Sequence, residues 1–363
     1  MKKLGIIGAG QLGLMIAQEA KAMGIYTIAL DPSSDSPAFN VTDEHIIAAF
    51  DDMNSLEILC QSCDVVTYEF ENIPAEVLEP LCQKYNIKQG CSQLLDSQDR
   101  LTEKTQARAH GLQTPEYISV ASGDSLIEAV ERIGYPCVLK TRRLGYDGHG
   151  QVVIRSEEDI QKGFKLLNVP CILEEFIDYD YEVSSIVVRS DSQSIIFPVG
   201  RNIHRDAIID LAIVPANISE MMSYRIDELS QRFMSECGYR GILTIEFFVR
   251  GEELIFNEMA PRPHNSGHYT IEGCSTNQFR ELVHYLFDMP LETPELLKPT
   301  IMKNILGEDL DEAIKIAEEG HDNVYVHLYG KSESRPKRKM GHITYVGMSA
   351  ECFENEWSNR FVK

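Results

Sequence analysis

The sequence predicts a chain of mixed α/β and α+β class that folds into two or three domains. Three observations support this prediction. The chain has 363 residues, which is more than a single hydrophobic core usually accommodates. Its first third alternates short apolar strands with helical segments, the pattern of a parallel sheet covered by helices. Its later parts contain pairs of strands joined by glycine-containing loops, which is typical of antiparallel pairing.

Composition and charge exclude several classes of protein. The chain is 43% hydrophobic and 25% charged, as ordinary globular proteins are, and no apolar run approaches the length of about 18 residues that a membrane span needs. The net charge of −22 argues against a general nucleic-acid surface. It also means that an anionic substrate needs a local group of Lys and Arg. Nine cysteines, an odd number spread along the chain, favour reduced thiols in a cytoplasmic protein.

The first predicted strand covers residues 4–7, so we expect no signal peptide there. Gly-Ala-Gly-Gln-Leu-Gly follows at residues 8–13, then a helix to about Met23 and a second strand from Tyr26 that ends at Asp31. A GxGxxG motif between a strand and a helix, with an acid about twenty residues later, is the usual fingerprint of a dinucleotide site. The helix N-terminus nevertheless favours any anion. The motif alone therefore leaves an NAD(P)-dependent dehydrogenase open as an alternative.

The next strand and its loop cover residues 65–74, Val-Val-Thr-Tyr-Glu-Phe-Glu-Asn-Ile-Pro. In an open parallel sheet the carboxyl ends of the strands face the ligand crevice. Glu69 and Glu71 are therefore expected where a small substrate could bind. Helix capping and a solvated loop charge are the alternatives.

The middle of the chain contains a second glycine-rich loop, at residues 145–151. A helix from about Arg100 to His110 precedes it, a strand ends at Lys140, and another strand covers residues 152–154. The loop glycines can turn backbone N–H groups toward phosphate oxygens and close over them as a lid. Because the loop joins two strands, it is neither a Walker A loop nor a Rossmann turn. A plain hairpin loop is the alternative.

Two polar residues further along, Glu182 and His204, are weaker candidates. A strand begins at Cys171 and contains Glu174, and Glu182 opens the strand after it. An acid at position 182 could bind ribose hydroxyls, with a surface salt bridge as the alternative. His204 is a candidate polar contact, although a lone histidine also serves structural roles.

Two apolar runs, residues 242–249 and 254–259, flank Arg-Gly-Glu and predict a β-hairpin. Counting from the turn places Glu246 nearly opposite Asn257 and Glu258. Carboxylates in apolar strands are costly to bury unless something pairs with them. Oxygen ligands of this kind suit Mg²⁺, which usually takes one or two carboxylates and leaves its other positions to water and phosphate.

Two further segments bring polar and basic groups. The loop after the hairpin carries Arg262, His264, Asn265 and His268 among prolines and glycines, so it can place several side chains beside a metal. Between residues 331 and 339 lies a basic cluster in an otherwise acidic chain. Such a cluster is a candidate anchor for a phosphate group, with a solvated turn as the alternative.

Together and in this order, these pieces resemble the ATP-grasp superfamily. The resemblance lies in Lys140, the loop at residues 145–151, Glu182, Glu246 and the Asn257-Glu258 pair. Within the superfamily, further motifs resemble the 5-(carboxyamino)imidazole ribonucleotide synthetase family of purine biosynthesis. These motifs lie at residues 8–13, 68–72, 146–148, 260–268 and 338–342, and the resemblance extends from residue 1 to about residue 347.

The resemblance implies three domains. These are a Rossmann-like N-terminal domain at residues 1–98, an ATP-grasp domain at 99–298 with a mobile lid at about 114–177, and a small C-terminal domain at 299–363. It implies that the GxGxxG motif is mainly structural. ATP and Mg²⁺ are the implied cofactors. The expected protein is a cytoplasmic homodimer that acts on small molecules and has no nucleic-acid or membrane partner.

The implied activity is that of a ligase that forms a carbon–nitrogen bond. ATP and bicarbonate carboxylate 5-aminoimidazole ribonucleotide through carboxyphosphate, with release of ADP and phosphate. The resemblance gives catalytic roles to Arg262 and Lys140 and metal-ligand roles to Glu246 and Glu258. The implied ATP contacts are Arg100, Lys140, Gly145, Tyr146, Asp147, Gly148, His149, Gly150, Gln151, Glu174, Glu175, Phe176, Ile177, Glu182, His204, Asn257 and Glu258. The implied ribonucleotide contacts are Glu71, Tyr146, Asp147 and Arg262, with the phosphate on Lys331 and Arg338.

The chain departs from the family pattern at His149, where the loop commonly has Lys or Arg. Three other functions remain as alternatives. A formate-dependent glycinamide ribonucleotide transformylase is disfavoured by the Pro-His-Asn-Ser-Gly-His run and by the C-terminal Lys–Arg pair. A dehydrogenase would leave Glu246 and Glu258 unexplained, and a non-catalytic nucleotide sensor would not need the whole set of carboxylates and phosphate-binding groups.

Overall fold

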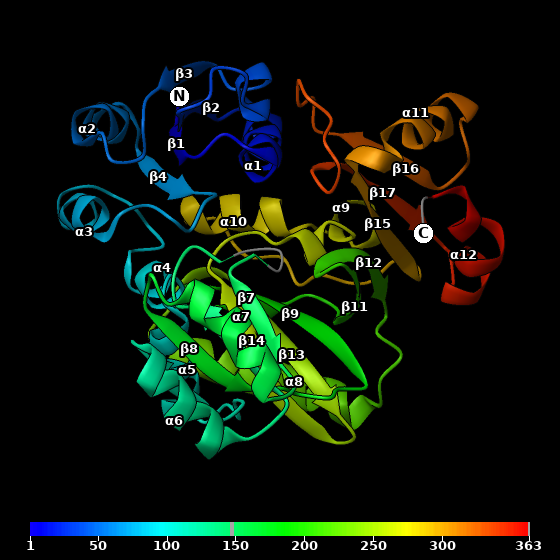
Figure 1. Cartoon of the computed structure of the whole chain (residues 1–363). Coiled ribbons are helices and arrows are strands. Elements are labelled where there is room, and N and C mark those ends of the chain that lie inside the picture. The colour runs from blue at the N-terminus through cyan, green and yellow to red at the C-terminus, as the bar shows by residue number, and fades with distance from the viewer. Residues whose placement is uncertain (146–148, 362–363) are drawn as a thin grey trace.

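The computed structural model describes residues 1–145 and 149–361, and this part of the chain contains three β-sheets (Figure 1). In this view the N-terminal elements (blue) lie above the strands drawn in green and yellow, and the C-terminal strands (orange to red) continue the central sheet that those strands form. This arrangement confirms the predicted mixed class. The predicted contacts at Tyr146, Asp147 and Gly148 lie outside the described residues. Within them, no helix is both long and apolar enough to cross a bilayer.

The N-terminal sheet is parallel throughout, with strand order β3-β2-β1-β4, and it confirms the βαβ pattern predicted at the start of the chain. Its inner strands are buried on both faces, which explains why their sequences are mostly apolar. The strands are β1 (Lys3–Ile7), β2 (Tyr26–Asp31), β3 (Glu44–Ile47) and β4 (Val65–Tyr68). The helices are α1 (Gln11–Ala22), η1 (Pro37–Asn40), α2 (Met53–Ser62), α3 (Ala75–Lys84) and α4 (Ser92–Ser97).

A second sheet is antiparallel, with strand order β5-β8-β6-β7. It coincides with the range proposed for the lid, and the second glycine-rich loop joins β6 to β7. Its strands are β5 (Tyr117–Val120), β6 (Cys137–Thr141), β7 (Gln151–Ile154) and β8 (Cys171–Glu175). The accompanying helices are α6 (Gly123–Ile133), α7 (Glu157–Gly163) and η2 (Phe164–Leu166), and α5 (Arg100–Ala109) precedes this sheet.

The central sheet has nine strands and contains the predicted hairpin at one edge. Its order is β14-β13-β9-β11-β12-β15-β17-β16, with β10 on β9. The strands are β9 (Tyr181–Arg189), β10 (Ser194–Ile196), β11 (Gly200–Arg205), β12 (Ile208–Val214), β13 (Gly241–Arg250), β14 (Glu253–Ala260), β15 (Thr300–Leu306), β16 (Val324–Leu328) and β17 (Lys339–Val346). The helices are α8 (Glu220–Glu236), η3 (Asn265–Gly267), α9 (Thr270–Gly273), α10 (Gln278–Leu286), η4 (Gly307–Asp309), α11 (Leu310–Glu319), α12 (Ala350–Glu356) and η5 (Ser358–Arg360).

The register of the β13–β14 hairpin confirms the predicted position of its carboxylates. Glu246 pairs with Glu258, but the next residue, Phe247, pairs with Phe256. Asn257 is therefore the extra residue of a β-bulge, a feature that redirects side chains locally. An unbroken register would pair Glu246 with Asn257, and the extra residue moves the partner of Glu246 to Glu258.

Candidate active site

The GxGxxG turn holds a carboxylate of the chain itself. The backbone N–H groups of Gly10 and Gly13 donate to the two carboxylate oxygens of Glu69, at 2.5 and 2.7 Å. A Cβ atom at Gly10 would lie 2.7 Å from Glu69 Oε1, and one at Gly13 would lie 2.8 Å from the carbonyl oxygen of Gly8. The glycines therefore make room for Glu69 and for close packing of α1 on β1. The anion preference of the helix N-terminus is already met by Glu69.

We expect the chain not to bind nicotinamide cofactors, because Glu69 occupies the position that a dinucleotide pyrophosphate would need. Calorimetric titration with NAD⁺ and with NADPH should show no saturable binding at millimolar cofactor, while ATP gives a measurable isotherm in the same cell. A micromolar dissociation constant for either dinucleotide would contradict the structural role of the motif.

A central cavity of about 690 Å³ opens between the N-terminal domain and the central sheet. It brings together six of the predicted site residues: Glu71, Arg100, Gly145, Glu246, Glu258 and Arg262. It also includes His264, Asn265 and His268 from the loop that follows the hairpin. Residues from four distant parts of the chain thus line one cavity, as the resemblance implies.

The two hairpin glutamates have opposite electrostatic environments. Glu246 accepts hydrogen bonds from Ser184 Oγ at 3.2 Å and Asn202 Nδ2 at 3.1 Å. Burial, and then the charges of Glu182 and Glu258, raise the pKa of Glu246 well above its usual value. Glu258 also loses hydration in the cavity, but the charge and hydrogen bond of Arg100 outweigh this loss and lower its pKa to about 2. An added cation would favour ionisation of both carboxylates.

Lys140 lies in a buried charge network that the sequence did not reveal. Its Nζ is 2.8 Å from Glu174 Oε2, and Lys104 Nζ is 3.5 Å from Glu174 Oε1. Burial disfavours the ionised form of Glu174, but the charges of Lys104 and Lys140 prevail and lower its pKa. The Glu174 carboxylate therefore pairs with two lysines and helps to position Lys140.

Glu182 and His204 lie on neighbouring strands of the central sheet, with His204 Nε2 3.5 Å from Glu182 Oε1. Burial and the charge of Glu258 raise the pKa of Glu182 to about 8. Three other predicted ATP contacts, at residues 175–177, lie in different environments. Glu175 Oε2 accepts from the backbone N–H of Glu116, the ring of Phe176 lies 5.3 Å from the guanidinium of Arg155, and Ile177 is buried.

Arg262 forms a two-pronged ion pair with Glu71. Its Nη2 donates to Glu71 Oε1 at 2.8 Å and its Nε donates to Oε2. Burial alone would lower the pKa of Arg262, but the charge and hydrogen bonding of Glu71 raise it. Beside it, burial and the charges of Arg262 and Lys339 lower the pKa of His264 to about 3, so this ring is neutral at pH 7. The guanidinium is thus oriented to hold a planar pair of oxygens, which bicarbonate also presents.

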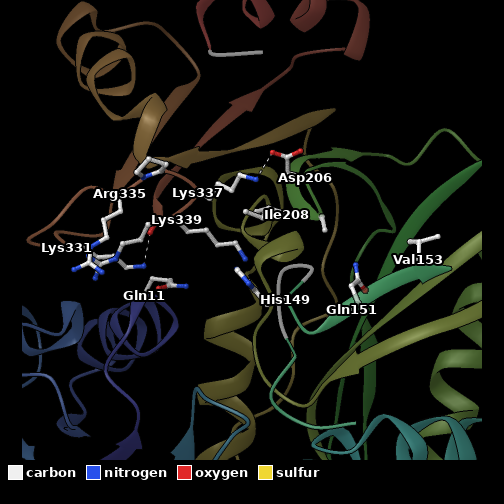
Figure 2. Close-up of a pocket in the computed structure, with 13 residues that line it drawn as sticks. Gln11, His149, Gln151, Val153, Asp206, Ile208, Lys331, Arg335, Lys337 and Lys339 are labelled. Carbon is white, nitrogen blue, oxygen red and sulfur yellow. Dashed lines mark hydrogen bonds and ion pairs between the residues drawn. The ribbon is translucent and has the colours of Figure 1, made fainter. Parts of the chain in front are cut away.

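A second cavity, of about 740 Å³, contains the C-terminal basic cluster (Figure 2). Lys331 and Arg338 line it, as do His149 and Gln151 from the end of the glycine-rich loop. Lys331 Nζ donates to the carbonyl of Lys339, and Arg338 Nη1 donates to that of Glu333, each at 2.7 Å. His149 and Gln151, predicted as ATP contacts, therefore lie on the same cavity as the predicted phosphate anchor. Gln11 and Lys339 line both cavities.

Sequence reasoning missed Glu103 and Lys104, both nearly inaccessible to solvent. Burial raises the pKa of Glu103 to about 8. The charge of Lys104 opposes this shift, and the charge of Glu258 adds to it. The spacing of Arg100, Glu103 and Lys104 does put them on one face of α5. A run of charges at that spacing is also typical of a solvated helix face, so the pattern alone does not favour a buried role.

Three family models match consecutive parts of the chain. The ribonucleotide synthetase preATP-grasp domain matches residues 1–98, the ATP-grasp domain residues 105–279, and the phosphoribosylaminoimidazole carboxylase C-terminal domain residues 300–356. These matches confirm the three-part architecture.

Similar proteins extend over the whole chain. The N5-carboxyaminoimidazole ribonucleotide synthase of Staphylococcus aureus strain COL is 43% identical over 99% of this chain and 96% of its own. The crystal structure of N5-carboxyaminoimidazole synthetase from Staphylococcus aureus with ADP is 42% identical, with a TM-score of 0.95 over 99% of this chain and 97% of that one. The Aspergillus clavatus synthase in complex with ADP and 5-aminoimidazole ribonucleotide is 29% identical, with a TM-score of 0.91 over 99% and 97% of the two chains. The chain belongs to the N5-carboxyaminoimidazole ribonucleotide synthase family of ATP-grasp proteins.

Proposed function

We propose that the chain carboxylates 5-aminoimidazole ribonucleotide in purine biosynthesis, using ATP and bicarbonate and releasing ADP and phosphate. The observation that carries this function is the two-pronged Arg262–Glu71 pair beside the Glu246–Glu258 pair in one cavity. A guanidinium that could hold an oxyanion thus lines the same cavity as two carboxylates that would suit a phosphate-bound cation. The relatives that carry the same activity in their names, and the Aspergillus clavatus complex with ADP and the ribonucleotide, support the assignment.

The reaction consists of two displacements. A bicarbonate oxygen attacks the γ-phosphorus of ATP, and the bond from this phosphorus to the β–γ bridging oxygen breaks. The products are carboxyphosphate and ADP. The exocyclic amine then bonds to the carboxyl carbon of carboxyphosphate or of CO₂ released from it, phosphate departs, and the amine loses a proton. The protein mainly positions groups and compensates charge. Lys140 would face the ATP phosphates, and Arg262 would hold the bicarbonate oxygens in place of the Glu71 carboxylate.

The residues present fit Mg²⁺ as a cofactor shared with the nucleotide. No group of three or more His, Cys, Asp and Glu side chains in residues 1–145 and 149–361 is arranged to hold a metal alone. Glu246 and Glu258 are neighbours across the hairpin, and the pKa of Glu246 is raised well above its usual value. Such a pair suits Mg²⁺, which usually takes one or two carboxylate ligands from the protein. Glu246 and Glu258 would hold this ion, and when bound it would neutralise charge on the phosphates.

Replacing Glu258 with glutamine should weaken metal binding, because the variant keeps the shape of the side chain and loses its charge. We expect a loss of at least about tenfold in Mg²⁺ affinity or in turnover. Replacing a residue that only hydrogen-bonds to a metal ligand already lowers metal affinity or activity by about that factor. The dependence of turnover on the Mg²⁺ concentration measures this effect. Unchanged turnover with an unchanged Mg²⁺ dependence would contradict the metal role of the hairpin.

The decisive test of the function is an ADP-release assay with 5-aminoimidazole ribonucleotide and bicarbonate each added or withheld. Full ADP release should require both compounds. A parallel reaction with glycinamide ribonucleotide and formate tests the transformylase alternative and should remain at the background rate. Turnover only in the parallel reaction, or ADP release that ignores both substrates, would contradict the proposal.

We also propose domain limits of 1–98, 99–298 and 299–363, and a cytoplasmic homodimer. The ranges of the three family models support these limits. Sedimentation at micromolar protein, with and without ATP, would determine the number of subunits.

A further inference from the structure

One face of α5 contacts the edge strand β14 at the point where Glu258 lies. Arg100, Glu103 and Lys104 have the i, i+3, i+4 spacing of neighbours on a helix surface. Arg100 Nη1 donates to Glu258 Oε2 at 2.9 Å. The other two side chains reach the backbone of the strand and do not contact the carboxylate.

The backbone contacts lie on either side of Glu258. Lys104 Nζ donates to the carbonyl oxygen of Asn257 at 2.8 Å, and Glu103 Oε1 accepts the N–H of Met259 at 2.6 Å. The first group belongs to the peptide before Glu258 and the second to the peptide after it. Both side chains are almost fully buried, at 0% and 2% exposure. These contacts therefore fix the two peptide planes that set the direction of the Glu258 Cα–Cβ bond.

The strand needs such contacts because of its place in the sheet. Among the strands of the described residues β14 pairs with β13 alone, and Asn257 forms the bulge in that pairing. Backbone groups on the free edge of a strand require other partners when they are buried. Without Glu103 and Lys104, two buried polar groups next to Glu258 would lose their hydrogen bonds.

The helix is itself held in place, so it can orient the strand. Asp99 caps α5 by accepting the N–H of Leu101 at 3.1 Å. The same carboxylate accepts two hydrogen bonds from Arg142, at 2.9 and 2.7 Å. The start of α5 is thus tied to the residue that follows β6, the strand that carries Lys140.

We propose that Glu103 and Lys104 are positioning residues that aim the Glu258 carboxylate at the metal ion of the bound nucleotide. Arg100 fixes the carboxylate end of the side chain, and Glu103 and Lys104 fix its backbone end. This inference rests on the metal role proposed for Glu258. It assigns to two buried residues of α5 a function in metal affinity in addition to stability.

The test measures metal binding directly, with Mn²⁺ as the probe. Electron paramagnetic resonance of free Mn²⁺ in the presence of saturating ADP gives the metal affinity of the full-length protein. We expect Glu103→Ala to weaken Mn²⁺ binding about tenfold. Glu103→Gln keeps an acceptor oxygen for the Met259 N–H and should stay within about twofold of the native protein. Calorimetry with ADP in the presence of a chelator should give nearly equal affinities for all three proteins.

Arg225→Met serves as the matched control. Arg225 Nη1 donates to the carbonyl of Glu252 at 2.7 Å, so this variant loses a solvent-exposed contact between a helix side chain and the backbone at the far end of the same hairpin. Its Mn²⁺ affinity should not change. An equal loss in Arg225→Met and Glu103→Ala would overturn the proposal, because it would indicate a general loosening of the hairpin.

Two more variants make the outcome decisive. If Glu103→Ala does not fold, Lys104→Met removes the contact to Asn257 instead, and an unchanged Mn²⁺ affinity in that variant overturns the proposal. Glu258→Gln separates the inference from the function on which it rests. Weak Mn²⁺ binding in Glu258→Gln with native binding in Glu103→Ala overturns the positioning role alone. Native binding in Glu258→Gln overturns the metal role as well.

Discussion

Replacement of Arg262 by methionine is expected to lower the turnover of ribonucleotide carboxylation by about a hundredfold to a thousandfold, the usual cost of removing one preorganised donor to a developing oxyanion. The expectation follows from geometry. Two nitrogens of the guanidinium already hold both oxygens of the Glu71 carboxylate, and bicarbonate offers the same planar pair of oxygens. Methionine keeps much of the side-chain volume and offers no donor.

Arg262→Lys is the comparison variant, because lysine keeps the charge and loses the planar fork. We expect it to remain at least about tenfold below the native enzyme. Since Arg262→Met leaves Glu71 without its partner, Arg262→Met combined with Glu71→Gln removes both charges of the pair and should stay equally inactive. Steady-state kinetics at saturating ATP measures all three variants. Turnover within threefold of native in Arg262→Lys would show that charge alone suffices and would contradict the proposed fork.

Local pattern was sufficient to predict the elements that carry the site. The βαβ unit was predicted from a short apolar strand, a glycine turn and an acid at Asp31, and the structure confirms it. The hairpin was predicted from two apolar runs around a glycine, and its register follows from the length of the turn. Glu246 could therefore be placed near Asn257 and Glu258 from the sequence, but the bulge that makes Glu258 its partner was not predicted.

Pairing between distant strands could not be predicted in the same way. The C-terminal strands continue the central sheet through pairing of β12 with β15. β15 is buried along its whole length although Lys303 and Asn304 interrupt its apolar residues, so its sequence indicates neither its full burial nor its partner strand. The family resemblance consequently implied a small C-terminal domain, but no pattern in the sequence indicated that its strands continue the sheet of the ATP-grasp domain.

The same limit applies within the site. Glu69 was recognised as an acid near the ligand crevice, but its contacts with Gly10 and Gly13 join residues 59 and 56 positions apart. Glu103 and Lys104 resembled a solvated helix face. In each case the residue type was visible and its partner was not, because the partner comes from another element of the fold.

The two ends of the active site should respond separately to the loss of a basic residue. We expect Arg338→Ala to raise the Michaelis constant for the ribonucleotide about tenfold to a hundredfold and to leave that for ATP nearly unchanged. A charge-assisted hydrogen bond contributes about 1.5–3 kcal/mol, and about 1.4 kcal/mol corresponds to tenfold in affinity. Lys140→Ala should do the opposite, because Lys140 pairs with Glu174 on the proposed ATP side while Arg338 lines the C-terminal cavity.

Lys337→Ala is the matched control for Arg338→Ala. Lys337 lines the same cavity, but its Nζ pairs with Asp206 Oδ2 at 2.8 Å, and its side chain is 58% exposed. Loss of an exposed ion pair has a small effect, so this variant should change either Michaelis constant by less than about threefold. If the two variants weakened ribonucleotide binding equally, the overall positive charge of the loop would account for the affinity, without a specific contact from Arg338. If Arg338→Ala weakened ATP binding and left ribonucleotide binding unchanged, the C-terminal cluster would belong to the ATP site. The proposed division of the active site into an ATP end and a ribonucleotide end would then be wrong.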